Sequence, residues 1–246
     1  MKKRGEVFEF AAIGEVRTPF PDKFGIPRQP GLVSQAKGVI KIHPDPDLKT
    51  ALRSLEEFSH LWIVFVFHEH GGKNWKPSIR PPRLGGNVKV GVLASRSPHR
   101  PNPIGLSAVK LDKVDFDAEG GPEIHVSGVD LLDGTPVLDI KPYIPYADSI
   151  PDANAGWASA PIPRHPVKFT DEAETEILKR DPDGSRGLRA LIIEVLELDP
   201  RPAYQARQVP VTDEKSWGTK HGFDLLGHDV KYEIHEGYFL VYNLLH

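Results

Sequence analysis

Short apolar runs separated by turn-forming residues dominate the first part of the chain. Each run is rich in Val, Ile, Leu or Phe and is bounded by Gly, Pro or Asp, which is typical of β-strands. The run LWIVFVF is apolar on both faces, which predicts a strand at the centre of a barrel or sheet. The predicted strands are residues 7–13, 38–42, 61–67, 88–94, 106–111, 124–129 and 136–140. This series of short strands predicts a mainly β fold, built as a small barrel.

One helical pattern interrupts these strands, in the segment DPDLKTALRSLEEF. Leu48, Leu52 and Leu55 recur there at helical spacing. Asp45 and Asp47 are both suited to cap the start of the helix, because a carboxylate accepts the free backbone N–H groups of a first turn. The pattern predicts a single helix and leaves the choice of cap open.

The composition changes at residues 149–166, where prolines and small residues replace the aliphatic runs. Such a segment is typical of a linker or of an extended piece of chain docked on a surface. The sequence therefore predicts a β-barrel over residues 5–148, a proline-rich linker over residues 149–166 and a smaller α+β part over residues 167–246.

The last part predicts two helices and a hairpin. Acidic residues directly follow Thr170, where they complement the dipole of a helix start. Residues 186–198 carry leucines and isoleucine near one helical face, which predicts a second helix. The final stretch KYEIHEGYFLVYNLL predicts a hairpin that turns at Glu236 and Gly237.

Charge and cysteine content limit the class of protein. The 31 Lys and Arg against 34 Asp and Glu give a net charge of −3, which excludes a wholly basic nucleic-acid coat protein but not a local basic patch. With no cysteine, disulfides, thiolate zinc sites and thiolate nucleophiles are excluded, and a reducing cytoplasm is favoured. The start MKKRGEVFEF lacks the apolar stretch of a signal peptide, and no apolar run is long enough to span a membrane. We therefore expect a soluble cytoplasmic protein without a membrane partner.

The densest polar stretch is SRSPHRPNPIG at residues 95–105. Arg96 and Arg100 offer planar charged forks suited to a carboxylate or a phosphate. Three prolines stiffen the loop, and a stiff loop loses less entropy when it binds a ligand. An ordinary surface turn between strands is the alternative, and the sequence leaves both open.

Other polar segments allow two interpretations each. His68 and His70 would point the same way on a regular strand and could share a metal ion, although spacing indicates no third ligand. The Asp-Gly-Thr-Pro stretch that starts at Asp133 suits a hairpin turn, or Asp133 accepts hydrogen bonds from a ligand. In DPRPAY, Arg201 and Tyr204 suit a phosphate and a stacked base, or the prolines only end a helix. No glycine-rich phosphate motif occurs, which argues against a Rossmann domain.

Taken together, these segments resemble the TsaA-like (TrmO) family of tRNA adenosine methyltransferases. The resemblance is carried by IGEVRTPF, GIPRQPG, FSHLWIVFVFH, GVLASRSPHRPNPIGLS and DLLDGTPVLDIKPYIPYADS, and DPRPAY resembles the longer bacterial members with a second domain. It implies a β-barrel enzyme that uses S-adenosyl-L-methionine, outside the Rossmann class, and that acts as a homodimer. It further implies N6-methylation of threonylcarbamoyladenosine beside the anticodon of threonine tRNAs.

The resemblance also implies a set of site residues. Those expected to bind the cofactor, in a pocket that two subunits share, are Pro27, Arg28, Gln29, His68, Glu69, Arg96, Leu106, Asp133, Gly134, Thr135 and Pro136. No metal is expected. Asp133 and Asp139 stay open as the acceptor of the N6 proton, and Arg100 suits the carboxylate of the threonyl group.

Contacts with tRNA are expected from the last part of the chain, with Arg201, Arg207 and Lys231 as phosphate ligands and Tyr204 as a stacking partner. Three rival functions stay open at this stage. They are an RNA-binding module without catalysis, a metal-dependent hydrolase that uses His68 and His70, and a methyltransferase with another substrate.

Overall fold

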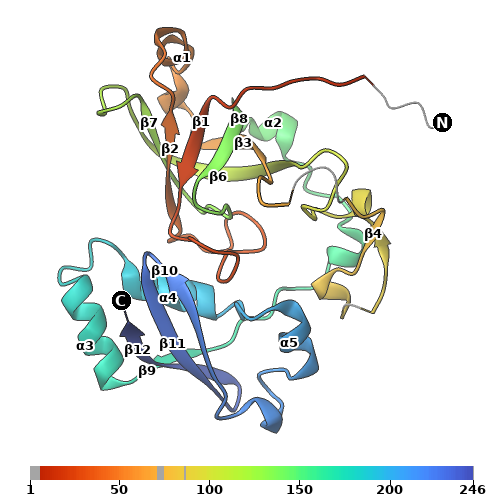
Figure 1. The fold of residues 1–246 in the computed structure, drawn as a ribbon, viewed down its shortest axis with the longest axis vertical. Helices are drawn as coiled ribbons and strands as arrows, with labels where there is room; N and C mark the ends of the chain where they lie inside the picture. Colours follow the sequence, from red (N-terminus) through yellow and green to blue (C-terminus); the bar gives the residue numbers. More distant parts are fainter. Residues whose placement is uncertain (1–5, 71–74, 86, 246) are drawn as a thin grey trace.

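Six antiparallel strands close the first part of the chain into a barrel (Figure 1). The computed structural model describes residues 6–70, 75–85 and 87–245, without the side chains of residues 203 and 204. Around the barrel the strands are β1 (Gly14–Arg17), β2 (Lys37–Ile42), β7 (Glu123–Ser127), β6 (Ile104–Asp115), β3 (His60–Val66) and β8 (Thr135–Pro142). The predicted mainly β barrel is confirmed.

Strand β3 has the central position that its apolar pattern predicts, between β6 and β8. Leu61, Ile63 and Phe65 alternate into the barrel interior and are almost fully buried. Each such side chain stabilises the fold by about 1.5–3 kcal/mol relative to an exposed one. Gly105 of β6 lies opposite Phe65, and a Cβ atom there would lie 2.1 Å from the Phe65 ring. A glycine is therefore required beside this phenylalanine.

Two predicted strands are wrong. Residues 7–13 form no strand, and their apolar side chains Val7, Phe8 and Phe10 are exposed. Within residues 88–94 only β5 (Val90–Gly91) is a strand, paired with β4 (Ser78–Ile79), and a 3-10 turn follows at Val92–Ala94. Both segments carry the side-chain pattern of a strand, but neither adds a strand to the barrel.

The helix between β2 and β3 is shorter than predicted. Helix α1 covers Pro46–Ala51, and a 3-10 turn at Leu55–Glu57 follows. Asp45 is the cap, because its carboxylate accepts hydrogen bonds from the backbone N–H groups of Asp47 and Leu48. Ser54 adopts a left-handed backbone with φ 63°, which separates the two helical pieces.

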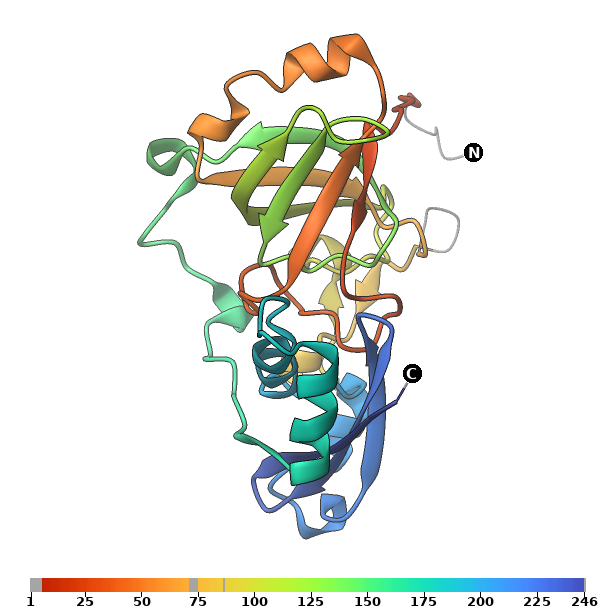
Figure 2. The ribbon, with the colours of Figure 1, turned by 90° about the vertical axis from the view of Figure 1, so that its left-hand side faces the viewer.

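The C-terminal unit is the predicted α+β structure. A four-stranded sheet in the order β10 (Lys220–Leu225), β11 (His228–His235), β12 (Tyr238–Leu245) and β9 (Val167–Phe169) carries α3 (Asp171–Arg180), which packs on β12 (Figure 2). The predicted second helix is α4 (Leu188–Leu196), and the predicted hairpin turns at Glu236 and Gly237. Two short helices complete the described chain, α2 (Pro145–Asp148) before the connecting segment and α5 (Ala203–Gln208) after α4.

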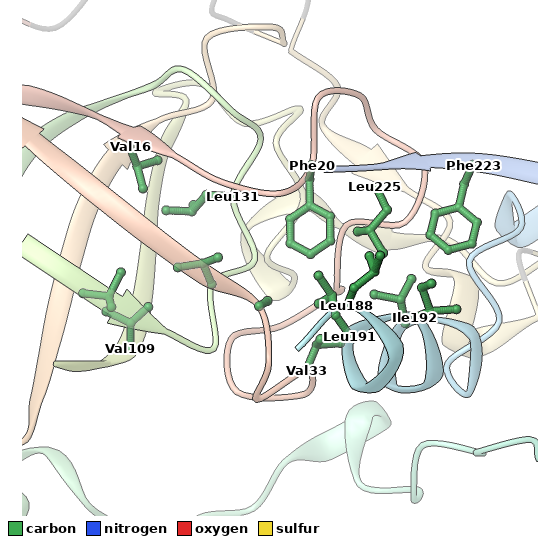
Figure 3. Packing of buried hydrophobic residues seen from close by; sticks show 14 of the residues in the cluster. Val16, Phe20, Val33, Val109, Leu131, Leu188, Leu191, Ile192, Phe223 and Leu225 are labelled. Carbon is green, nitrogen blue, oxygen red and sulfur yellow. The ribbon is translucent and has the colours of Figure 1, made fainter. Parts of the chain in front are cut away.

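The two units share one hydrophobic core. Phe20 and Val33, from loops of the barrel unit, meet Leu188, Leu191 and Leu225 of the C-terminal unit (Figure 3). The Glu194 carboxylate of α4 adds polar contacts, since it accepts hydrogen bonds from the Ser34 hydroxyl and the Gln35 backbone N–H. The predicted division at residues 148 and 167 stays a prediction, because residues on both sides of it belong to one hydrophobic core. No helix among the described residues has the length and apolar character needed to cross a bilayer.

Candidate functional site

A groove of about 1660 Å³ lies where the barrel unit meets the C-terminal unit. Its barrel wall consists of the loops at residues 23–33, 76–83 and 94–99. The opposite wall consists of residues 155–165, the end of α4 and residues 198–212. Loops far apart in sequence therefore share one concave surface.

Two proline-framed loops meet in this groove. The Arg96 guanidinium donates a hydrogen bond to the Gln29 side-chain oxygen at 2.5 Å, across 67 residues of sequence. Pro27, Arg28 and Gln29 line the groove together with Arg96. The structure thus brings together these four of the residues predicted to bind the cofactor.

Asp130 connects Arg96 to the barrel wall. The Ser107 hydroxyl donates a hydrogen bond to the Asp130 carboxylate at 2.6 Å, and Arg96 attracts the same carboxylate electrostatically. Burial raises the pKa of Asp130 to about 6, because desolvation outweighs the stabilisation from Ser107 and Arg96. A carboxylate with this pKa exchanges protons near neutral pH. Asp130 is the functional candidate that sequence reasoning missed, and its place in the DLLDGTP segment was the only signal.

The two aspartates named from the sequence have other partners. Asp133 accepts a hydrogen bond from the Thr18 backbone N–H at 2.8 Å and lies 3.3 Å from the Arg17 guanidinium. Asp139 forms an ion pair with Lys141 at 2.8 Å on the outside of β8. The described contacts of these two carboxylates do not involve Arg96.

The turn that follows Asp133 is held against the barrel wall. Gly134 has φ +74°, a left-handed conformation that favours glycine, and its N–H donates to the Val16 carbonyl. The Thr135 hydroxyl donates to the Leu132 carbonyl, and Pro136 pairs with Glu15 of β1. The hairpin-turn interpretation of this stretch therefore describes its local structure, and its predicted role in cofactor binding stays a prediction.

The loop after β3 contacts a groove-lining loop through His70. The rings of His70 and His99 pack edge to face at 5.3 Å, and His99 lines the groove. Burial and nearby positive charge, including Lys23, lower the pKa of both imidazoles. The described residues contain no cluster of three potential metal ligands.

His68, Glu69 and Leu106 are not among the residues that line the groove. The His68 imidazole lies 3.9 Å from the carboxylate of its neighbour Glu69. Leu106 lies on β6 with 53% of its surface exposed. The groove of one chain therefore holds only part of the predicted cofactor set.

Arg100 and Arg201 bind their own chain. Arg100 braces its loop by donating to the carbonyl oxygens of Ser95 and Ser97. The Arg201 side chain is 3% exposed and donates two hydrogen bonds to Asp199 and one to the Val209 carbonyl. This geometry does not support the predicted phosphate contact of Arg201, because burial and internal partners occupy its guanidinium.

Of the other two cations predicted to contact RNA, one lies in the groove and one is paired with a carboxylate. Arg207 lines the groove, whereas Lys231 is paired with Asp229 at 2.5 Å on the C-terminal sheet. The side chain of Tyr204 lies outside the described residues, so its predicted stacking role stays a prediction.

A closed antiparallel barrel, joined through a groove to a smaller α+β unit, defines a two-part β-barrel protein outside the Rossmann class. Residues 15–149 match the sequence model of the tRNA-methyltransferase O N-terminal domain, and residues 162–246 match that of the TrmO C-terminal domain. The chain belongs to the TrmO family of tRNA methyltransferases.

Individual relatives agree with this assignment. The chain is 49% identical to the tRNA (adenine(37)-N6)-methyltransferase of Escherichia coli K12, over 80% of this chain and 84% of that protein. It is 46% identical to a putative S-adenosylmethionine-dependent methyltransferase, RcsF, of Pseudomonas aeruginosa PAO1, over 78% and 81% of the two chains. The crystal structure of TrmO from Pseudomonas aeruginosa superposes with a TM-score of 0.77 at 34% identity, covering 98% of this chain and 99% of that one. The resemblance seen in the sequence is confirmed.

Proposed function

We propose that this protein is an S-adenosylmethionine-dependent methyltransferase that modifies the N6 atom of adenine 37 in tRNA. The observation that carries the proposal is the family match over both units, with 49% identity to an enzyme of that name. The Arg96–Gln29 contact adds a chemical reason, because it places an exposed guanidinium inside a large groove.

The polar groups around Arg96 fit the amino-acid end of S-adenosylmethionine. Arg96 offers donors for the carboxylate at that end of the cofactor. When bound, the cofactor supplies a methyl group on a sulfonium that is its own leaving group. The chain's task is then to align the N6 atom with that methyl group and to keep water out.

We further propose that the acceptor base is N6-threonylcarbamoyladenosine of threonine tRNA. Its N6 lone pair is delocalised into the urea group, so the N6 proton must leave during or after methyl transfer. Asp130 is our candidate for the proton acceptor, because burial raises its pKa to about 6, near the neutral pH at which a general base works best. The Arg100 guanidinium is bonded to the carbonyl oxygens of its own loop. We therefore propose that another cation of the groove binds the threonyl carboxylate of the substrate.

We also infer that the protein acts as a homodimer in the cytoplasm. Leu106 is 53% exposed and Ile104 is 42% exposed on β6, and exposed apolar side chains of this kind suit a contact with a second copy. A second copy would also explain why Leu106 and Asp133 do not line the groove of their own chain. Light scattering coupled to size exclusion tests this, and a monomer at micromolar concentration contradicts it.

The direct test is methyl transfer. Wild-type protein is incubated with isotope-labelled S-adenosylmethionine and with threonine tRNA that carries or lacks the threonylcarbamoyl group, and the nucleosides are then separated by mass. Label on N6 of adenosine 37 supports the function, and label only in the modified tRNA supports the finer substrate. A nucleoside without label in both arms contradicts the proposal.

A further inference from the structure

Positive charge gathers in the groove although the chain as a whole is acidic. Asp199 is the only acidic residue among the described groove-lining residues, and it is already bonded to the buried Arg201. The remaining cations are seven exposed residues and the half-buried Arg207. The exposed ones are Lys23, Arg28, Lys76, Arg80, Arg83, Lys89 and Arg96.

No carboxylate lies within ion-pair distance of these eight cations, although Asp199 attracts Arg28 and Asp130 attracts Arg96 over a longer distance. Within the described part of the chain, none of them forms an ion pair. Lysines elsewhere on the barrel do form ion pairs, such as Lys41 with Glu123 and Lys49 with Asp117. Ion pairs therefore do not neutralise the positive charge of the groove. Unpaired like charges repel one another, and an anionic ligand relieves that repulsion.

The connecting segment forms one wall of this groove. The Trp157 indole N–H donates a hydrogen bond to the Ala94 carbonyl at 3.1 Å, two residues before Arg96. The Arg83 guanidinium donates to the Ala160 carbonyl, which ties the segment to the barrel unit a second time. Figure 1 shows the segment passing from the barrel to the C-terminal unit on the side of β4. The stretch expected to be a linker is therefore docked.

Trp157 presents an aromatic surface beside these cations. Its side chain lines the groove and is 37% exposed, although its N–H is already bonded. A cationic groove with an aromatic platform is the arrangement that binds single-stranded nucleic acid, in which phosphates meet the cations and a base stacks on the ring. The volume of about 1660 Å³ also exceeds the roughly 300–1,000 Å³ of a small-molecule site.

We infer that this groove is the RNA-binding surface of the protein, with its exposed cations other than Arg96 on the phosphates and Trp157 stacked on an unpaired base of the anticodon loop. The inference rests on the proposed function for the identity of the RNA, and it moves most of the expected RNA contacts from the C-terminal unit to the barrel loops and the connecting segment. The groove is then wide enough for nucleotides beside the cofactor.

Binding of a fluorescein-labelled anticodon stem–loop RNA, measured by anisotropy without cofactor, tests the electrostatic part. Arg80→Gln and Lys89→Gln should each lower the slope of log K against log salt by about 0.7–0.9, the loss of one phosphate contact. The matched control is Arg53→Gln, since Arg53 is exposed, unpaired within the described chain and next to α1 at the far end of the barrel (Figure 1). Groove variants that bind like the control overturn the inference.

Two substitutions of Trp157 test the stacking part. Trp157→Ala should weaken RNA binding about 5- to 150-fold, the range for one stacked base. Trp157→Phe keeps a ring but loses the N–H donor to Ala94, so it should retain most of the affinity. Equal losses of affinity in both variants would show that Trp157 acts through its N–H bond to Ala94, which fixes the connecting segment, and would overturn the stacking role.

Further arms separate this inference from the proposed function and from a protein partner. Unlabelled poly-L-glutamate at equal charge should compete poorly, and equal competition would indicate a surface for an acidic protein instead. If the wild-type protein methylates tRNA but the groove variants bind RNA normally, the groove is not the RNA-binding surface and the proposed function still stands. If the groove variants lose RNA binding but the wild-type protein transfers no methyl group, the proposed function is contradicted and the RNA-binding groove still stands.

Discussion

We expect cofactor binding to depend most on the guanidinium group of Arg96. It is exposed in the groove, bonded to Gln29 and close enough to Asp130 to attract it. Arg96→Ala should lower the affinity for S-adenosylmethionine by roughly 10- to 150-fold, which corresponds to about 1.5–3 kcal/mol for one charged hydrogen bond. Titration calorimetry measures the change, and an unchanged melting temperature shows that the variant is folded. Wild-type affinity would remove Arg96 from the cofactor site.

Asp130 should set the pH dependence of the reaction. As a proton acceptor whose pKa is about 6, it makes kcat rise with pH through that value in the wild-type enzyme. Asp130→Asn should lower kcat by about 10²- to 10⁴-fold with little change in KM for tRNA. The comparison variant is Asp139→Asn, which removes an exposed carboxylate paired with Lys141 and should keep the wild-type profile. A pH profile of Asp130→Asn that parallels the wild type would refute the assignment.

The same carboxylate links pH to stability. Because folding raises the pKa of Asp130 above its ordinary value of 3.8, its contribution to stability is present below that value and is lost as the pH rises through about 6. The wild type should therefore lose stability relative to Asp130→Asn between about pH 4 and pH 7. Urea unfolding at several pH values measures this difference. A difference that does not vary with pH would mean that Asp130 has an ordinary pKa.

At the scale of the elements, β3 and β6 depend on the pairing of Phe65 with Gly105. Gly105→Ala should destabilise the fold by about 1–3 kcal/mol or more, because its Cβ would lie 2.1 Å from the buried Phe65 ring. Gly91→Ala is the matched control, since it has open space and φ −60°, and should change stability by less than about 0.5 kcal/mol. The double variant Phe65→Leu with Gly105→Ala should recover part of the loss. Equal stabilities of the two single variants would contradict this packing.

Elements whose causes are local were predictable from the sequence. The strand at residues 61–67 and the helix start near Asp45 follow from the side-chain pattern and from a nearby cap. Residues 7–13 and 88–94 have the same pattern, but the first forms no strand and the second forms only the two-residue β5, because hydrogen-bonded partners are a property of the whole fold. The same distinction between local and tertiary causes applies to the site. The polar loop around Arg96 is visible in the sequence, whereas the burial of Asp130 and its contact with Ser107 depend on packing across the barrel.

At the scale of the whole molecule, one core joins the barrel and C-terminal units. Phe20 extends from a barrel loop and is fully buried against the C-terminal unit (Figure 3). Phe20→Ala should destabilise the protein by about 3–5 kcal/mol and lower the hydrogen-exchange protection of β3 and β11 together. Loss of protection in one unit alone would show that the two units unfold independently.

The order of strands in the C-terminal sheet has a consequence for biosynthesis. Strand β9 pairs only with β12, in parallel, and helix α3 packs on that same strand. A ribosome releases β9 and α3 long before it makes β12, so these segments wait without their partner while the barrel strands ahead of them are already complete. All six strands of the barrel are therefore synthesised before the C-terminal sheet can be completed, and that sheet is complete only after β12 has left the ribosomal exit tunnel.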